Sequence, residues 1–182
     1  MNFLKTELEG VWIIEPKLHS DSRGYFCETY RADLFEQATG IRPDFVQDNE
    51  SESSRGVVRG LHFQAGSHSQ AKLVRVSYGA IIDCAVDLRR SSPTFGRHIL
   101  VELSRQNRRQ LFIPRGFAHG FAVLTPKANF IYKTDNFYNP QSERTILFDD
   151  PDLAIQWPLD RAQMILSPKD LAGKPFAEVE KF

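Results

Sequence analysis

The stretch RGVVRGLHFQ, residues 55–64, decides the fold of this 182-residue chain, together with IPRGFAHGF at residues 113–121. Each is a short run typical of a β-strand, and each carries one histidine, His62 in the first and His119 in the second. An imidazole has an unperturbed pKa of about 6.5, which suits it to proton transfer near neutral pH. Two strand-like runs with inward imidazoles predict one barrel with one pocket.

The rest of the chain favours a β-rich domain. Apolar, β-branched or aromatic runs recur between clusters of Gly, Pro, Asn and Ser, which is the spacing of a sandwich or barrel. These runs lie at residues 73–88, 98–103, 109–114, 119–124, 129–134 and 144–149. We therefore expect one mainly β domain over residues 1–182, closed as a jelly-roll barrel or sandwich, with a few short helices.

Two short helices interrupt the β pattern. Residues 32–39, ADLFEQAT, precede Gly40, and glycine is the residue that most often follows the end of a helix. A second helix is expected after Ser167, with Pro168 in its first position. Ser167 and Asp170 also have the S-x-x-D spacing of a capping box. From the residues alone, the better interpretation of Asp170 is a helix cap.

Charge and cysteine content argue against several classes of function. The chain has 23 basic and 23 acidic residues, so no net field attracts nucleic acid or an anionic membrane. Cys27 and Cys84 form no C-x-x-C pair, and we interpret both as small buried hydrophobic residues. The first residues, MNFLKTELEGV, contain neither a signal-peptide core nor a long apolar span. We expect a cytoplasmic protein without nucleic-acid or membrane partners.

The P-x-G-x-x-H spacing of Pro114, Gly116 and His119 resembles the second half of the motif of the cupin superfamily. Metal-binding cupins usually place a second histidine two residues after the first, and a glutamate a few residues later. In this chain Gln64 occupies that second position, and a carboxamide is a poor ligand for zinc or iron. We therefore expect a pocket with no metal and no cofactor.

More specifically, the chain resembles the dTDP-4-dehydrorhamnose 3,5-epimerase family of cupin-type enzymes. The resemblance covers nearly the whole chain, in the family's order, through residues 23–31, 45–64, 70–96, 113–121, 132–140 and 149–158. It implies an isomerase that works without a cofactor on a dTDP-4-keto-6-deoxyhexose. The expected reaction inverts carbons 3 and 5 of dTDP-4-dehydro-6-deoxy-D-glucose and gives dTDP-4-dehydro-L-rhamnose.

The resemblance also implies four catalytic residues. Inversion next to a ketone needs a base on one face of the sugar, an acid on the other, and positive charge at the ketone oxygen. His62 matches the family's base and Asp170 the carboxylate that holds its other ring nitrogen, so the resemblance reverses the interpretation of Asp170 as a cap. Tyr132 matches the proton donor, and Lys72 matches a cation near the sugar.

Eight further residues match substrate-binding positions of the family. Arg23 and Arg59 carry guanidinium groups suited to phosphate oxygens. The other six are Phe26, Glu28, Gln47, Asn49, His119 and Tyr138. In the family, the segment with Arg23, Phe26 and Glu28 reaches the site of the neighbouring subunit, which implies a homodimer.

Other functions remain open at this point. One is a mono-epimerase or a ketoisomerase that acts on a related dTDP-4-keto sugar. Another is a cupin that binds a sugar nucleotide without catalysis. A binding protein needs no paired base and acid, so the joint presence of His62, Asp170, Tyr132 and Lys72 favours an enzyme.

Overall fold

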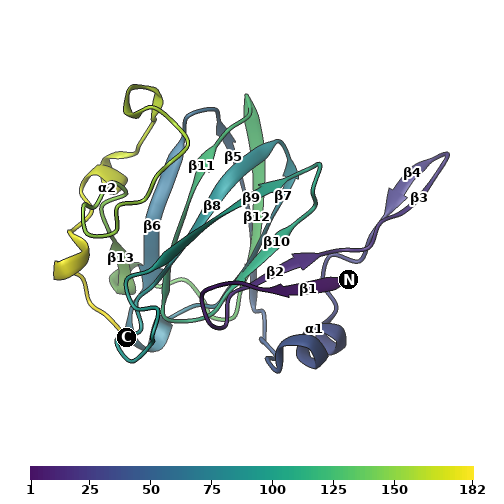
Figure 1. The fold of residues 1–182 in the computed structure, drawn as a ribbon, viewed down its shortest axis with the longest axis horizontal. Helices are drawn as coiled ribbons and strands as arrows, with labels where there is room; N and C mark the ends of the chain where they lie inside the picture. The colour runs from purple at the N-terminus through teal and green to yellow at the C-terminus, as the bar shows by residue number, and fades with distance from the viewer.

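The chain forms a sandwich of two antiparallel β-sheets, described for all 182 residues by a computed structural model (Figure 1). The six-stranded sheet has the order β1-β2-β10-β7-β12-β5, and the five-stranded sheet has the order β13-β6-β11-β8-β9. A third, two-stranded sheet consists of β3 and β4. The expected class, mainly β with a few short helices, is confirmed.

The strands of each large sheet come from distant parts of the chain. The six-stranded sheet contains β1 (Asn2–Lys5), β2 (Trp12–Glu15), β5 (Gln47–Ser54), β7 (Lys72–Tyr78), β10 (Gln110–Ile113) and β12 (Lys127–Thr134). The five-stranded sheet contains β6 (Val58–Gln64), β8 (Ala80–Asp87), β9 (His98–Ser104), β11 (Phe117–Val123) and β13 (Glu143–Thr145). The largest core cluster includes Val74 of β7, Phe130 of β12 and Phe121 of β11, so it fills the space between the sheets.

Gly79 divides the apolar run at residues 73–88 into two strands that belong to different sheets. β7 ends at Tyr78 and β8 begins at Ala80. Gly79 has a φ of +77°, a left-handed conformation that residues with a Cβ rarely adopt. A Cβ at this position would also lie 2.1 Å from the carbonyl oxygen of Lys127. The run therefore turns the corner between the sheets where the sequence pattern indicated one continuous segment.

Several strands are absent from the predicted set, and β5 is absent because it lacks an apolar pattern. β5 has the sequence QDNESESS, yet it pairs with β12 along its whole length. It is an edge strand, and polar residues suit a strand that has a neighbour on one side only. β1 and β2 are also absent from the predicted set. The predicted run at 144–149 forms a strand only over Glu143–Thr145.

Both expected helices are confirmed. Helix α1 spans Ala32–Thr39, and the N–H of Gly40, which has a φ of +73°, donates to the Glu36 carbonyl at 2.8 Å. The ring of Phe35, the buried residue of α1, meets Phe112 of β10 edge to face at 4.9 Å. Helix α2 spans Pro168–Leu171, and a complete capping box with Ser167 precedes it. Short 3-10 turns occur at Gly66–His68, Pro140–Ser142, Arg161–Gln163 and Phe176–Glu178.

A β-hairpin projects from the body of the molecule. It consists of β3 (His19–Asp21) and β4 (Gly24–Phe26), and all its strand residues are exposed (Figure 1). Phe26 is 66% exposed, and the guanidinium of Arg108 lies over the ring of Tyr25 at 4.2 Å. An isolated two-stranded hairpin is marginally stable in water. This arm therefore leaves apolar surface uncovered within one chain.

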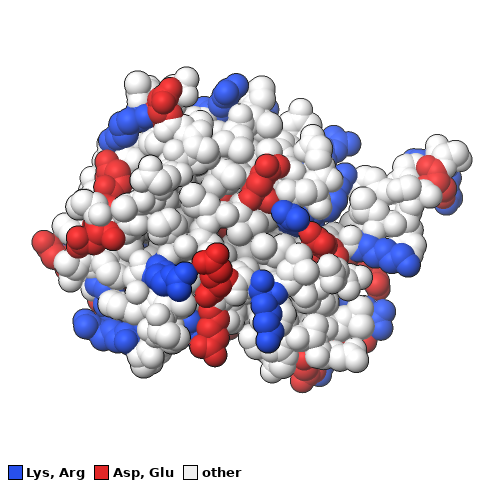
Figure 2. All heavy atoms as spheres, viewed as in Figure 1, with Lys and Arg blue, Asp and Glu red and all other residues white.

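The surface carries both signs of charge. On the face shown in Figure 2, acidic and basic side chains are interspersed, and the projecting hairpin carries charges of both signs at its outer end. No helix of the molecule is both long and apolar enough to cross a membrane.

Replacing Gly79 by alanine should destabilise the sandwich by about 2–3 kcal/mol, because the substitution adds a backbone clash to left-handed strain. Gly40→Ala is the matched control, since Gly40 has nearly the same φ but no atom within 4 Å of the point where a Cβ would lie. Its cost should stay at about 1 kcal/mol. Urea unfolding of both variants measures the difference, and equal costs would contradict the role assigned to the corner.

Candidate active site

The two sheets enclose a cavity of about 330 Å³ whose lining residues come from both of them. The five-stranded sheet contributes Arg59, His62, His119, Gly120 and Phe121. The six-stranded sheet contributes Asn49, Glu50, Ser51, Lys72, Phe130 and Tyr132, and α2 contributes Lys169. The lining is therefore mostly polar and charged, with aromatic side chains from Phe121, Phe130 and Tyr132.

Strand register brings the predicted residues to the inner faces of the sheets. On one sheet, His62 lies directly opposite His119. On the other, Tyr132 lies opposite Asn49, and Thr134 lies opposite both Gln47 and Lys72. Side chains of directly opposed residues point to the same face of a sheet. His62 and Tyr132 thus face the cavity from opposite sheets.

His62 contacts the carboxylate of Asp170 through one ring nitrogen. Its Nε2 lies 2.8 Å from Oδ1 of Asp170, although the approach is bent away from a linear N–H hydrogen bond. The His62 side chain is 26% exposed, whereas that of Asp170 is only 4% exposed. The other ring nitrogen of His62, Nδ1, is left for a ligand in the cavity.

Asp170 is both a helix cap and the partner of His62, so the two sequence interpretations are compatible. Oδ1 also accepts from the backbone N–H of Gly60 at 3.0 Å. Oδ2 accepts from the hydroxyl of Ser167 at 2.6 Å and from its N–H at 3.3 Å. Burial alone would raise the pKa of Asp170, but the contact with His62, followed by the donors of Ser167 and Gly60, holds that pKa well below its usual range. The carboxylate is charged at neutral pH.

A second carboxylate–imidazole pair lies beside the first. Nε2 of His119 is 2.9 Å from Oδ1 of Asp83, and both residues are buried. Burial raises the pKa of Asp83 and lowers the pKa of His119, while their contact opposes both shifts. Asp83 was not predicted, although a charged residue inside the apolar run IIDCAV is a usable signal, because buried carboxylates need a partner.

Lys72 projects into the cavity without a carboxylate within ion-pair distance. Desolvation lowers the pKa of Lys72 to about 8, and the nearby charges of Asp83 and Glu143 oppose that shift. The amine is consequently still mostly protonated at neutral pH. It supplies a cation that no group of the protein neutralises directly, which suits it to stabilising a developing anion.

Tyr132 keeps its proton across the neutral range. Burial raises the pKa of this phenol, the charge of Glu143 raises it further, and the charge of Arg59 lowers it. A protonated phenol across the cavity from an imidazole can deliver a proton to the far face of a ligand. The cavity therefore has an imidazole on one wall and a protonated phenol on the other.

The remaining cavity residues offer donors to a polar ligand. Asn49 accepts from Gln47 at 2.8 Å through Oδ1, while its buried Nδ2 has no partner in the protein. Arg59 donates through Nε to Ser53 at 3.1 Å, which leaves the ends of its guanidinium available. Tyr138 lies outside the cavity lining, and its backbone N–H donates to the side chain of Gln47 at 3.2 Å.

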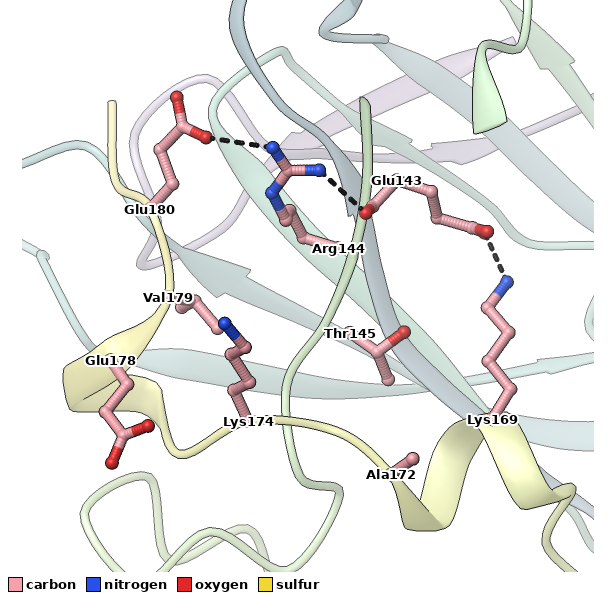
Figure 3. A pocket seen from close by; sticks show the side chains of 9 residues that line it. All are labelled: Glu143, Arg144, Thr145, Lys169, Ala172, Lys174, Glu178, Val179 and Glu180. Atoms are coloured by element: carbon pink, nitrogen blue, oxygen red, sulfur yellow. Dashed lines mark hydrogen bonds and ion pairs between the residues drawn. The ribbon is translucent and has the colours of Figure 1, made fainter. Parts of the chain in front are cut away.

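Lys169, which lines the cavity, and its ion-pair partner Glu143, which does not, were both missed from the sequence. Lys169 forms an ion pair with Glu143, and Glu143 accepts from the hydroxyl of Tyr138 at 3.0 Å. Lys169 also borders a second, outer hollow of about 450 Å³ (Figure 3). Around that hollow Arg144 pairs with Glu180 and Lys169 with Glu143, and the hollow is lined by neither His62 nor Tyr132. No spacing or composition signal pointed to Glu143 or Lys169.

Three predicted residues do not approach the cavity of their own chain. Arg23 pairs with Asp21 at 2.5 Å, Phe26 is exposed, and Glu28 lies 3.9 Å from Arg31. All three belong to the projecting hairpin or to the segment that follows it.

The position expected for a second metal-binding histidine is used structurally. Gln64 is buried, and its Oε1 accepts from the backbone N–H of Asn139 at 2.9 Å. No three His, Cys, Asp or Glu side chains are grouped so that they could hold a metal ion. The cofactor-free site nevertheless stays a prediction.

Comparison with known proteins identifies the family. The profile of the family described as dTDP-4-dehydrorhamnose 3,5-epimerase matches residues 5–178. The dTDP-4-dehydrorhamnose 3,5-epimerase of Shigella flexneri is 50% identical over 182 residues, which are 100% of this chain and 99% of that protein. The chain belongs to this family.

Solved structures agree with this assignment. The dTDP-4-dehydrorhamnose 3,5-epimerase of Elizabethkingia anophelis has a TM-score of 0.95 and 50% identity, covering 100% of this chain and 99% of its own. The Legionella pneumophila 3,5-epimerase in complex with dTDP-4-keto-L-rhamnose has a TM-score of 0.94 and 49% identity, and the match covers 98% of this chain and 94% of that one. A 3′-monoepimerase from Streptomyces bikiniensis in complex with dTDP-quinovose has a TM-score of 0.88 and 35% identity, and the match covers 94% of this chain and 86% of that one.

The low pKa of Lys72 generates a pH prediction. Because the amine is charged below its pKa of about 8, kcat/KM should fall as the pH rises through that value. In Lys72→Arg the guanidinium stays charged, so the decline should disappear even if the rate is lower. Steady-state rates between pH 6 and 10, about two units on either side of the Lys72 pKa, measure the pH profiles of the wild type and of the arginine variant. If kcat/KM of the arginine variant still declines over the same pH range, the decline belongs to a group other than Lys72.

Proposed function

We propose that this protein is a dTDP-4-dehydrorhamnose 3,5-epimerase that inverts carbons 3 and 5 of dTDP-4-dehydro-6-deoxy-D-glucose. The single observation that carries the proposal is the pairing of His62 and Tyr132 across one cavity, from opposite sheets. Inversion at carbon requires removal of a proton from one face and delivery to the other. Membership of the family supplies the substrate class.

The reaction starts with His62. Hydrogens on carbons 3 and 5 are both α to the ketone, so His62 can remove either one and leave an enolate. Asp170 stabilises the imidazolium that forms and keeps the ring in one orientation. Lys72 stabilises the negative oxygen of the enolate. Tyr132 then delivers a proton to the opposite face, and solvent restores both residues before the second carbon reacts. No step uses a metal or a cofactor.

The nucleotide half of the substrate is bound by the polar residues around the cavity. Arg59 contacts the diphosphate, because a guanidinium presents a planar set of donors to phosphate oxygens. Asn49, His119 and the neighbouring Gln47 and Tyr138 complete the contacts to sugar and nucleotide. The unpartnered Nδ2 of Asn49 supports this role, since a buried donor without a partner is costly.

The functional unit is a homodimer. The exposed hairpin with Arg23, Phe26 and Glu28 extends into the cavity of the partner subunit, where Arg23 binds phosphate and Phe26 packs on the base or sugar. The exposed aromatic side chains of the hairpin support this assembly. The enzyme acts in the cytoplasm, where both Cys27 and Cys84 remain free thiols.

Double inversion is favoured over single inversion. The chain is 49–50% identical to structures of two 3,5-epimerases and 35% identical to the 3′-monoepimerase. A binding protein without catalysis is disfavoured, because such a protein has no use for the His62–Asp170 pair opposite Tyr132.

Turnover in heavy water tests the reaction and its two proton carriers. The wild-type protein should place deuterium at carbons 3 and 5 with inversion at both. His62→Ala should lower turnover by about 10²- to 10⁴-fold, as expected for loss of a general base. Binding of dTDP should stay nearly intact in this variant. Label at only one carbon would identify a mono-epimerase, and a fully active His62 variant would exclude His62 as the base.

Tyr132→Phe separates proton removal from proton delivery. His62 should still exchange the substrate hydrogen in this variant, but it can return deuterium only to the face it came from. NMR of the sugar should therefore show label with retained configuration. Full inversion by the phenylalanine variant would exclude Tyr132 as the acid.

Complementation tests the exchanged hairpin. A chain with Arg23, Phe26 and Glu28 all replaced by alanine should be nearly inactive alone, as should a His62→Ala chain. Coexpressed, they should regain about a quarter of wild-type activity, because half of the dimers are mixed and each has one intact site. Absence of recovery, with mixed dimers demonstrated by differential tags, would show that each hairpin serves its own chain or none.

A further inference from the structure

Four contacts from three residues surround the carboxylate of Asp170. Gly60 and His62 contact Oδ1 at 3.0 and 2.8 Å. The hydroxyl and the N–H of Ser167 both donate to Oδ2, at 2.6 and 3.3 Å. The terminal torsion of an aspartate is soft, so contacts on both oxygens are needed to fix the plane of the carboxylate. Ser167 alone supplies the contacts on Oδ2.

The Ser167 hydroxyl does more than cap the helix. As an N-cap, its oxygen accepts from the N–H of Asp170 at 3.2 Å. Its own proton goes to the Asp170 side chain at 2.6 Å, a short bond to a charged acceptor. The helix that it caps is only four residues long, from Pro168 to Leu171, and Asp170 is its one buried residue. The cap therefore positions a single buried side chain.

The contact between His62 and Asp170 cannot orient the carboxylate by itself. It is short but bent, and His62 Nε2 forms no linear hydrogen bond. Orientation must then come from Gly60 and Ser167. The Gly60 contribution is a backbone N–H, and a Cβ at Gly60 would lie 2.6 Å from the His119 carbonyl oxygen, so substitution there would disturb the strands. Ser167 is the contact that a side-chain change can remove alone.

We propose that Ser167 is a positioning residue of the epimerase: its hydroxyl holds the Asp170 carboxylate in the orientation that supports His62 as the base. Ser167 does not line the cavity, so it acts through Asp170 and not on the substrate. The inference rests on the proposed function, since it assigns a new residue to the same site.

Three substitutions at Ser167 separate positioning from helix capping. Glycine is an acceptable N-cap and costs a helix little, whereas alanine is a poor one. A cap alone predicts that Ser167→Gly is nearly as active as wild type and that Ser167→Ala is less stable. Positioning predicts that both lose about tenfold in kcat with KM and dTDP affinity unchanged. Ser167→Thr keeps a hydroxyl and should restore most of kcat.

A double-mutant cycle identifies the route of the effect. If Ser167 acts through Asp170, the Asp170→Asn variant should lose almost nothing further when Ser167→Ala is added. Additive losses would show that Ser167 acts independently of Asp170 and would overturn the proposal. Full kcat in both the alanine and glycine variants would overturn it as well.

A matched control excludes general loosening of the fold. Ser104, a buried serine at the end of β9, accepts from the N–H of Asn107 at 3.1 Å and lines no part of the cavity. Ser104→Ala should lower the melting temperature with no loss of kcat. If the wild-type protein itself fails to label the sugar in heavy water, the proposed function fails. If the wild type labels it and the Ser167 variants keep full kcat, only the positioning role fails.

Discussion

The Asp170 carboxylate is the point at which folding and chemistry depend on the same atoms. One oxygen caps the one-turn helix α2, and the other holds β6 through Gly60 and contacts His62. A buried carboxylate is costly unless its lone pairs are occupied, and here donors surround both oxygens. The carboxylate that holds the C-terminal segment against β6 is thus the same group that contacts His62.

The sandwich separates the two halves of a proton transfer. Base and acid on one strand would act on the same face of a ligand, whereas two facing sheets place them on opposite sides of it. His62 comes from the five-stranded sheet and Tyr132 from the six-stranded sheet. Burial acts differently on two groups of the six-stranded sheet, since it raises the pKa of Tyr132 and brings the pKa of Lys72 down to about 8. That wall of the cavity therefore holds a protonated phenol and a cation, and neither has a carboxylate at hydrogen-bond distance.

The projecting hairpin, β3 and β4, is the part of the fold that a single chain leaves without packing partners. Its strands are short, exposed and separate from both large sheets, and its aromatic side chains contact little of their own chain. Such a segment gains stability only from surface outside its own fold. Arg23, Phe26 and Glu28 accordingly lie away from the cavity of their own chain.

The sequence by itself determined the β-rich class and both helices, and it predicted His62, Tyr132 and Lys72, which line one cavity in the structure. Periodic apolar runs, Gly40 after α1 and the capping box before α2 are local signals, and each survives in the structure because local backbone preferences and burial agree there. The polar edge strand β5, the corner at Gly79, the wall residue Lys169 and its partner Glu143 carry no such signal. Their places depend on which strands lie opposite one another, and Asp83 contacts His119 only because β8 pairs with β11. Tertiary structure also decided that Asp170 is at once the helix cap and the contact of His62, because only the folded chain sets Gly60 and His62, more than a hundred residues earlier, against the oxygen that the helix leaves free.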